Sequence, residues 1–177
     1  MTLTLVRHAE VVEEFQGKYN GHLDISLSCK GKEDAIKLGE TLKEKHFDLI
    51  YCSDLLRAKE TLSLCKRAEK QIFTSKLREK SWGKHEGMSF EAIEKTGIKY
   101  ENFTQWIDAL DGEKKEPYIA RIKNFFETLK QKKETNLLIV THSGVIKTLL
   151  HITQGISLEE AFTTQLEYTQ SLELELK

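Results

Sequence analysis

Short apolar runs and segments of helical periodicity alternate along the chain. Runs of strand length occur at residues 2–6, 47–52, 71–74 and 136–140, and a segment that alternates apolar and polar residues follows at 171–176. Between them, apolar residues three or four positions apart predict helices at 29–45, 55–65, 117–130 and 145–153, with a short helix near residue 158. This order predicts a three-layer α/β/α sandwich, with a mainly parallel central sheet and one antiparallel edge strand.

Local signals indicate where several helices begin. Ser28 is the expected N-cap of the helix at 29–45, and Ser53 with Asp54 suits the start of the next helix through capping and the helix dipole. Pro117 fits the first turn of a later helix. The predicted apolar face of that helix consists of Ile119, Ile122, Phe126 and Leu129.

Two regions lack a regular pattern. Residues 9–27 are mostly polar and contain a turn signal at 19–21, which predicts a long functional loop. Residues 80–115 combine glycine-punctuated segments with helical fragments between 89 and 110, which predicts an insertion or lid. Because no linker divides the chain, we expect a single domain over residues 1–177.

Composition narrows the range of functions. The chain is 39% hydrophobic and 31% charged, with a net charge of −1, so no global positive field favours nucleic acid or membranes as partners. The N-terminus lacks a signal-peptide pattern and no apolar run approaches roughly 18 residues, so we expect a cytoplasmic protein. Three scattered cysteines without a CxxC pair, and histidines without close spacing, predict neither a disulfide framework nor a metal site.

Polar side chains with catalytic potential follow four of the predicted strands. Arg7 and His8 follow the first strand, Arg57 the second, Glu79 the third and His142 the strand at 136–140. Arg7 and His8 alone could equally be ordinary polar residues at a strand end. Parallel strands, however, place their carboxyl ends at one edge of the sheet. We therefore expect the five side chains to converge there.

The chemistry that suits this set is phosphoryl transfer. Two arginines match phosphate oxygens bidentately. The amides of Ser143 and Gly144, at the start of a predicted helix, offer further donors to an anion. A neutral imidazole can attack phosphorus and form a covalent intermediate. Glu79 can protonate the leaving oxygen and later deprotonate water.

Five segments resemble the motifs of the histidine phosphatase superfamily, also called the phosphoglycerate mutase-like superfamily, and together they span nearly the whole chain. Residues 5–10 (LVRHAE) resemble its Arg-His-Gly-Glu signature, and residues 19–28 resemble its Tyr-Gln-Gly…Asp-x-Pro-Leu-Ser stretch. Residues 51–61 are similar to the motif of its second arginine. Residues 77–87 are similar to its acid-residue segment, and residues 140–145 to its second-histidine segment.

The resemblance implies a role for each residue. His8 would be the nucleophile that forms a phosphohistidine, and Glu79 would be the general acid and base. Arg7, Arg57 and His142 would bind the phosphoryl group and stabilise its transition state. No metal or other cofactor would be required, because the cations replace the magnesium common in other phosphoryl-transfer sites. The expected partner is a small phosphorylated substrate, and the chain would act as a monomer or homodimer.

Four positions depart from the pattern of the family. Ala9 and Ser143 stand where the family usually has glycine, Val11 where it has threonine, and Glu14 where many members place an asparagine that touches phosphate. A carboxylate at that place would repel a dianion and weaken phosphate binding. We expect Glu14 to point to solvent instead, with Asn20 or another donor and Ser143 contacting the phosphate.

The short chain with one modest insertion resembles the phosphatases of the family more than its mutases. The Gly112-Glu113 segment also resembles the α-ribazole phosphatases of cobalamin synthesis. We therefore expect a hydrolase that acts on phosphate monoesters, with α-ribazole 5′-phosphate as one candidate substrate. Mutase-type phosphoryl transfer and a non-catalytic protein that binds phosphorylated ligands are the alternatives. The departures at Ala9, Val11, Glu14 and Ser143 support the non-catalytic alternative, whereas the intact set of five predicted catalytic residues opposes it.

Overall fold

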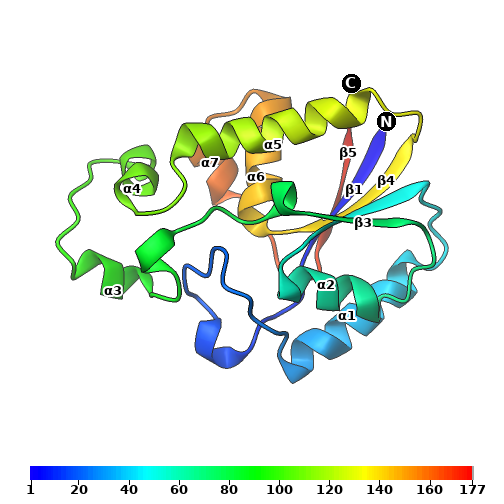
Figure 1. Cartoon of the computed structure of the whole chain (residues 1–177), viewed down its shortest axis with the longest axis horizontal. Coiled ribbons are helices and arrows are strands. Elements are labelled where there is room, and N and C mark those ends of the chain that lie inside the picture. The colour runs from blue at the N-terminus through cyan, green and yellow to red at the C-terminus, as the bar shows by residue number, and fades with distance from the viewer. Residues whose placement is uncertain (177) are drawn as a thin grey trace.

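A single five-stranded sheet forms the centre of the computed structural model, which describes residues 1–176 (Figure 1). Its strands are β1 (Thr2–Arg7), β2 (Leu49–Ser53), β3 (Gln71–Thr74), β4 (Asn136–Thr141) and β5 (Ser171–Glu175). The strand order is β3-β2-β4-β1-β5, and β5 alone runs antiparallel to its neighbour. The predicted mainly parallel sheet with an antiparallel edge is confirmed.

Helices cover both faces of this sheet (Figure 1). The α-helices are α1 (Cys29–Leu42), α2 (Leu56–Leu64), α3 (Phe90–Glu94), α4 (Phe103–Ala109), α5 (Lys115–Lys130), α6 (Ser143–Gln154) and α7 (Leu158–Thr163). Short 3₁₀ helices are η1 (Glu13–Phe15), η2 (Ser75–Leu77) and η3 (Gly83–His85). One face packs against α1 and α2 and the other against α5 and α6, so the predicted three-layer α/β/α sandwich is confirmed.

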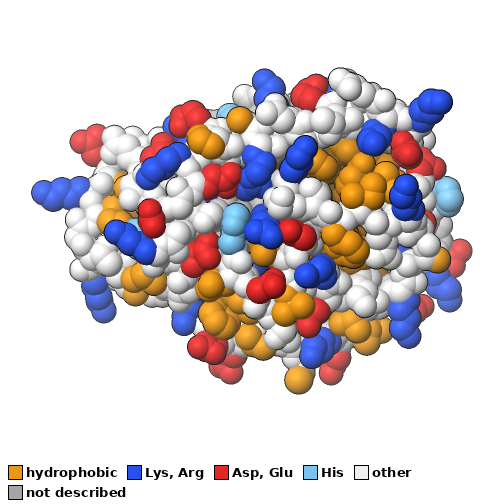
Figure 2. All heavy atoms as spheres, viewed as in Figure 1, with side chains coloured by type: hydrophobic (Ala, Val, Ile, Leu, Met, Phe, Trp, Pro, Cys, Tyr) orange, Lys and Arg blue, Asp and Glu red, His pale blue; other side chains and the backbone are white. Residues whose placement is uncertain are grey.

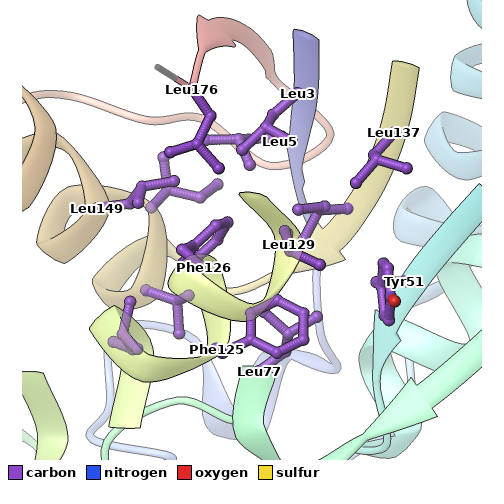
Figure 3. Close-up of a cluster of buried hydrophobic side chains, with 14 of the residues drawn as sticks. Leu3, Leu5, Tyr51, Leu77, Phe125, Phe126, Leu129, Leu137, Leu149 and Leu176 are labelled. Carbon is purple, nitrogen blue, oxygen red and sulfur yellow. The ribbon is translucent and has the colours of Figure 1, made fainter. Parts of the chain in front are cut away.

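The central strands are apolar throughout because both of their faces are buried. Leu137 and Ile139 of β4 pack toward α5 and α6, whereas Leu138 and Val140 pack toward α1 and α2. This division follows the two-residue period of a strand. Figure 3 shows the α5 side of the core, where Phe125 and other apolar side chains of that helix meet the strands.

The start of α1 agrees with the prediction, whereas the predicted start of α2 is wrong. Ser28 caps α1, since its Oγ accepts a hydrogen bond from the Gly31 amide at 2.9 Å. At α2 the N-cap position is Leu55, which makes no side-chain capping bond. Ser53 is the last residue of β2, and the carboxylate of Asp54 binds the Arg78 guanidinium through two bonds of 2.7 Å. Both side chains have tertiary partners, which outweigh their local preference for a helix start.

The insertion predicted at 80–115 carries α3 and α4 and has a small core of its own. Ile93, Trp106 and Leu110 are buried together and pack against Tyr19 and Trp82. The Trp106 indole Nε1 donates a hydrogen bond to the Tyr19 hydroxyl at 3.0 Å. The insertion is therefore attached to the polar loop after β1, and its movement as a lid stays a prediction.

The surface carries both signs of charge. Basic and acidic side chains are interspersed over the face seen in Figure 2, in keeping with a net charge of −1. In the described part of the chain, residues 1–176, we find no helix with the length and apolar character needed to cross a membrane.

Candidate active site

A cavity of about 400 Å³ lies at the carboxyl edge of β1 and β4. Five of the predicted site residues line it, namely Arg7, His8, Arg57, Glu79 and Ser143. His142 lies next to His8, with 5.1 Å between the ring centroids. A larger groove of about 790 Å³ between α5, α6 and β5 is lined by none of these residues. The sheet edge therefore brings the predicted residues together.

His8 directly follows β1, and the surrounding protein fixes the hydrogen on its ring. The His8 Nδ1 lies 2.8 Å from the carbonyl oxygen of Ala9. Because a carbonyl can only accept, Nδ1 carries the hydrogen and Nε2 carries the lone pair. Burial, with a smaller contribution from the positive charge of Arg57, holds the pKa of His8 well below its ordinary value. Both effects keep Nε2 available as a nucleophile.

Arg7 is held from behind and presents donors to the cavity. Its Nη1 donates to the Leu166 carbonyl oxygen, and its guanidinium lies 3.9 Å from the centre of the Tyr168 ring. Its Nε is buried and has no hydrogen-bond partner within residues 1–176. A buried donor without a partner is costly, so a bound anion would satisfy it.

Arg57 connects α2 to the polar loop after β1. Its Nη1 donates to the Leu23 carbonyl oxygen at 2.8 Å, and its Nη2 donates to the Gly21 carbonyl oxygen at 2.7 Å. The side chain is buried, and each of these nitrogens has a second hydrogen. Arg57 therefore both fixes the loop and offers a forked pair of donors to a phosphoryl group.

The second histidine is oriented by a serine at the end of β2. The His142 Nε2 lies 2.8 Å from the Ser53 Oγ, and both residues are buried. Ser53 Oγ also accepts from the Leu55 amide, so its own hydrogen is directed to His142 Nε2. Nδ1 of His142 then carries the other hydrogen, and it is buried without a partner in the described chain. This N–H is a donor suited to a phosphoryl oxygen.

Replacing Ser53 with alanine would remove the bond that sets this tautomer. We expect kcat for an aryl phosphate to fall about tenfold, the effect of losing one oriented hydrogen bond. Steady-state kinetics would measure it, with Ser63→Ala on the exposed side of α2 as the matched control. An unchanged kcat in Ser53→Ala would show that the serine does not orient His142.

Glu79 follows β3 and η2, and its carboxylate accepts three hydrogen bonds. Its Oε1 accepts from the Lys80 amide at 2.9 Å and from the Tyr118 hydroxyl at 3.1 Å. Its Oε2 accepts from the Gly144 amide at 2.9 Å. The backbone of Glu79 is also fixed, since its carbonyl oxygen accepts from His22 Nε2 at 2.9 Å. Such a framework holds the carboxylate at one place in the cavity.

Two expected phosphate donors are already engaged. The Gly144 amide binds Glu79, so the expectation that it offers an anion donor is wrong for this arrangement. Ser143 opens α6 at the cavity wall, and its amide is among those that have no acceptor within a helix. Asn20 lines the cavity, but its Nδ2 donates to the Phe15 carbonyl oxygen at 2.7 Å. Its contact with phosphate stays a prediction that depends on its second N–H.

The departures from the family pattern have local explanations. The Ala9 methyl is buried against Leu27 and Ala35, and Ala9 is not among the residues with positive φ. Val11 forms an isolated bridge with Leu27. Glu14 is exposed in η1 and does not line the cavity, as expected. These three side chains are therefore compatible with an anion beside His8.

Several cavity residues were missing from the sequence prediction. Lys147 and Phe162 line the wall, and the Lys147 Nζ donates to the Phe162 carbonyl oxygen at 3.1 Å. Tyr168 packs against both Arg7 and His8. Tyr168 immediately precedes an antiparallel strand, so it reaches the same sheet edge as the residue after β1. The direction of the last strand was the signal that could have identified it.

Comparisons with known proteins agree with this geometry. The family model described as Histidine phosphatase superfamily (branch 1) matches residues 3–177. A broad-specificity phosphatase from Saccharomyces cerevisiae is 32% identical over 84% of this chain and 68% of that protein. The 2,3-bisphosphoglycerate-dependent phosphoglycerate mutase 2 of Gloeobacter violaceus is 26% identical over 94% of this chain and 81% of that protein. The crystal structure of the alpha-ribazole phosphatase from Shigella flexneri matches with a TM-score of 0.87 and 27% identity, covering 100% of this chain and 91% of that one.

Proposed function

Because the chain belongs to the histidine phosphatase superfamily, we propose that it is a metal-independent phosphomonoesterase that acts through a phosphohistidine on His8. The observation that carries this proposal is the ring of His8. Its Nδ1–H is bound to Ala9, its charge is suppressed, and it shares a cavity with the guanidinium groups of Arg7 and Arg57. A neutral nucleophile beside two cations favours attack on a phosphate dianion.

In the first step, Nε2 of His8 attacks phosphorus in line with the leaving oxygen. The new N–P bond forms as the P–O bond breaks, and the leaving oxygen keeps the electron pair and takes a proton from Glu79. Arg7, Arg57 and the Nδ1–H of His142 stabilise the charge on the equatorial oxygens.

In the second step, water attacks the phosphohistidine. Glu79, now a carboxylate, takes a proton from the water as its oxygen bonds to phosphorus. The N–P bond breaks and its electron pair returns to His8 Nε2, which regenerates the neutral imidazole. The same carboxyl group serves as acid and then as base, so one turnover leaves the enzyme unchanged.

We further propose that the substrate is a small phosphorylated metabolite. A cavity of about 400 Å³ suits a phosphate with a leaving group of modest size, and Tyr19, Trp82 and Phe162 supply aromatic wall. Such walls fit a planar group, which supports α-ribazole 5′-phosphate as a candidate. Support also comes from the likeness to the Shigella flexneri alpha-ribazole phosphatase.

A direct comparison of substrates tests this proposal. The purified protein, in excess chelator, would be given α-ribazole 5′-phosphate or 3-phosphoglycerate, with kcat/KM and products measured for each. We expect release of inorganic phosphate and a higher kcat/KM for α-ribazole 5′-phosphate. An equal or lower value would reject the α-ribazole assignment. Transfer of phosphate to a second hydroxyl, rather than to water, would identify a mutase like the Gloeobacter violaceus relative.

A further inference from the structure

Tyr118 contacts the proposed acid–base residue from the buried side of α5. It occupies one apolar stripe of that helix with Ile122, Phe125, Phe126 and Leu129. Its ring belongs to the core on the α5 face of the sheet, and its hydroxyl reaches Glu79 Oε1 at 3.1 Å. Burial and the negative charge of Glu79 raise the pKa of Tyr118 well above its ordinary value. The phenol therefore stays protonated and donates to the carboxylate.

The two oxygens of Glu79 differ in the number of donors that they accept. Oε1 accepts from both the Tyr118 hydroxyl and the Lys80 amide. Oε2 accepts from the Gly144 amide alone. Because each carboxylate oxygen has two lone-pair sites, Oε1 is fully occupied and Oε2 keeps one site open. Only Oε2 can take or give a proton without breaking an existing hydrogen bond.

The backbone of α6 is shaped around this arrangement. A Cβ atom at Gly144 would overlap Glu79 Oε1 and would lie 2.9 Å from the Tyr118 hydroxyl. Gly144 thus permits its amide, the carboxylate and the phenol to approach one another closely. Three elements, namely α5, α6 and the segment after η2, meet at the carboxyl group of Glu79.

We propose that Tyr118 is a positioning residue that occupies Oε1 of Glu79 and so makes Oε2 the oxygen that exchanges protons with the leaving group and with water. This rests on the proposed function, in which Glu79 is the acid and base. In the first step, the Oε2–H bond breaks as the leaving oxygen takes the proton, and its electron pair stays on Oε2. In the second step, Oε2 takes one proton from the attacking water, which restores the O–H bond.

The variant Tyr118→Phe removes the hydroxyl and keeps the ring. Two consequences are expected. Oε1 gains an open site, so part of the protonated Glu79 would carry its proton on the wrong oxygen and kcat would fall about tenfold. The carboxylate also loses a donor that favours its charged form, so the alkaline limb of the kcat/KM profile would move up by about one pH unit.

Tyr51→Phe is the matched control. Tyr51 is buried in the same core, where its ring packs against Phe125 (Figure 3). It makes no hydrogen bond to Glu79 in the described structure. The control would lose the same atom from the same core, yet its pH profile should match that of the unmodified protein. Equal shifts in the two variants would overturn the proposal, because they would reflect packing alone.

A titration that needs no turnover separates this proposal from the proposed function. With ¹³C-labelled glutamate, the Glu79 carboxyl resonance would be assigned through Glu79→Gln and followed against pH. Its midpoint should lie about one pH unit higher in Tyr118→Phe than in the unmodified protein and in Tyr51→Phe. An unchanged midpoint would overturn the positioning role. Failure of the phosphatase proposal would appear differently, as no phosphate release by the unmodified protein.

Discussion

Replacing His8 with alanine is expected to reduce phosphate release by about 10⁴-fold or more, because the reaction loses the atom that bonds to phosphorus. Arg7, Arg57 and His142 would remain, so binding of phosphate should persist while turnover stops. The measurement is hydrolysis of an aryl phosphate in excess chelator. In the unmodified protein, acid-labile label from the phosphoryl group should also remain on the protein after rapid denaturation, and in His8→Ala it should not.

The control for this variant is His46→Ala. His46 is exposed and does not line the cavity, so its activity should equal that of the unmodified protein. Thermal unfolding of both variants would establish that they fold. Turnover retained by His8→Ala would exclude a phosphohistidine at this residue. Loss of turnover by the unmodified protein in chelator would contradict the metal-independent mechanism.

The sequence was sufficient to predict the sheet because its central strands are buried on both faces. The run at 136–140 is continuous and apolar, and a segment of this kind is typical of a central parallel strand. Arg7, His8 and His142 could be predicted for the same reason, since each directly follows or ends such a strand. Parallel topology then brings side chains together that are more than 130 residues apart in the chain.

The contacts that orient the site could not be predicted from local signals. Ser53 and Asp54 fit a helix start, yet the tertiary bonds to His142 and Arg78 determine their conformation. Similarly, Tyr118 and Gly144 meet Glu79 only because α5 and α6 pack on the same face of the sheet. Tyr118 does fit the apolar stripe of α5 better than the predicted Ile119, which is half-buried. The sequence could therefore indicate its burial, but not the partner of its hydroxyl.

Arg57→Lys separates the charge of the second arginine from its shape. Lysine keeps one positive charge but has a single nitrogen, so it cannot bind two carbonyl oxygens and a phosphoryl group together. The variant would release the loop carbonyls of Gly21 and Leu23 and lose the forked contact with phosphate. We expect kcat/KM to fall roughly a hundredfold, with a rise in KM and a loss of kcat, because the contact strengthens in the transition state.

Arg67→Lys is the matched control, because Arg67 also binds two backbone carbonyl oxygens. Its Nη1 donates to Leu42 at 2.8 Å and its Nη2 donates to Lys45 at 2.9 Å, and it does not line the cavity. Both variants remove a guanidinium that stabilises a loop, so both should lower the thermal midpoint. Only Arg57→Lys should lower kcat/KM strongly. If the two variants lost activity to the same extent, the effect of Arg57 would be on folding, and its role in phosphoryl transfer would be rejected.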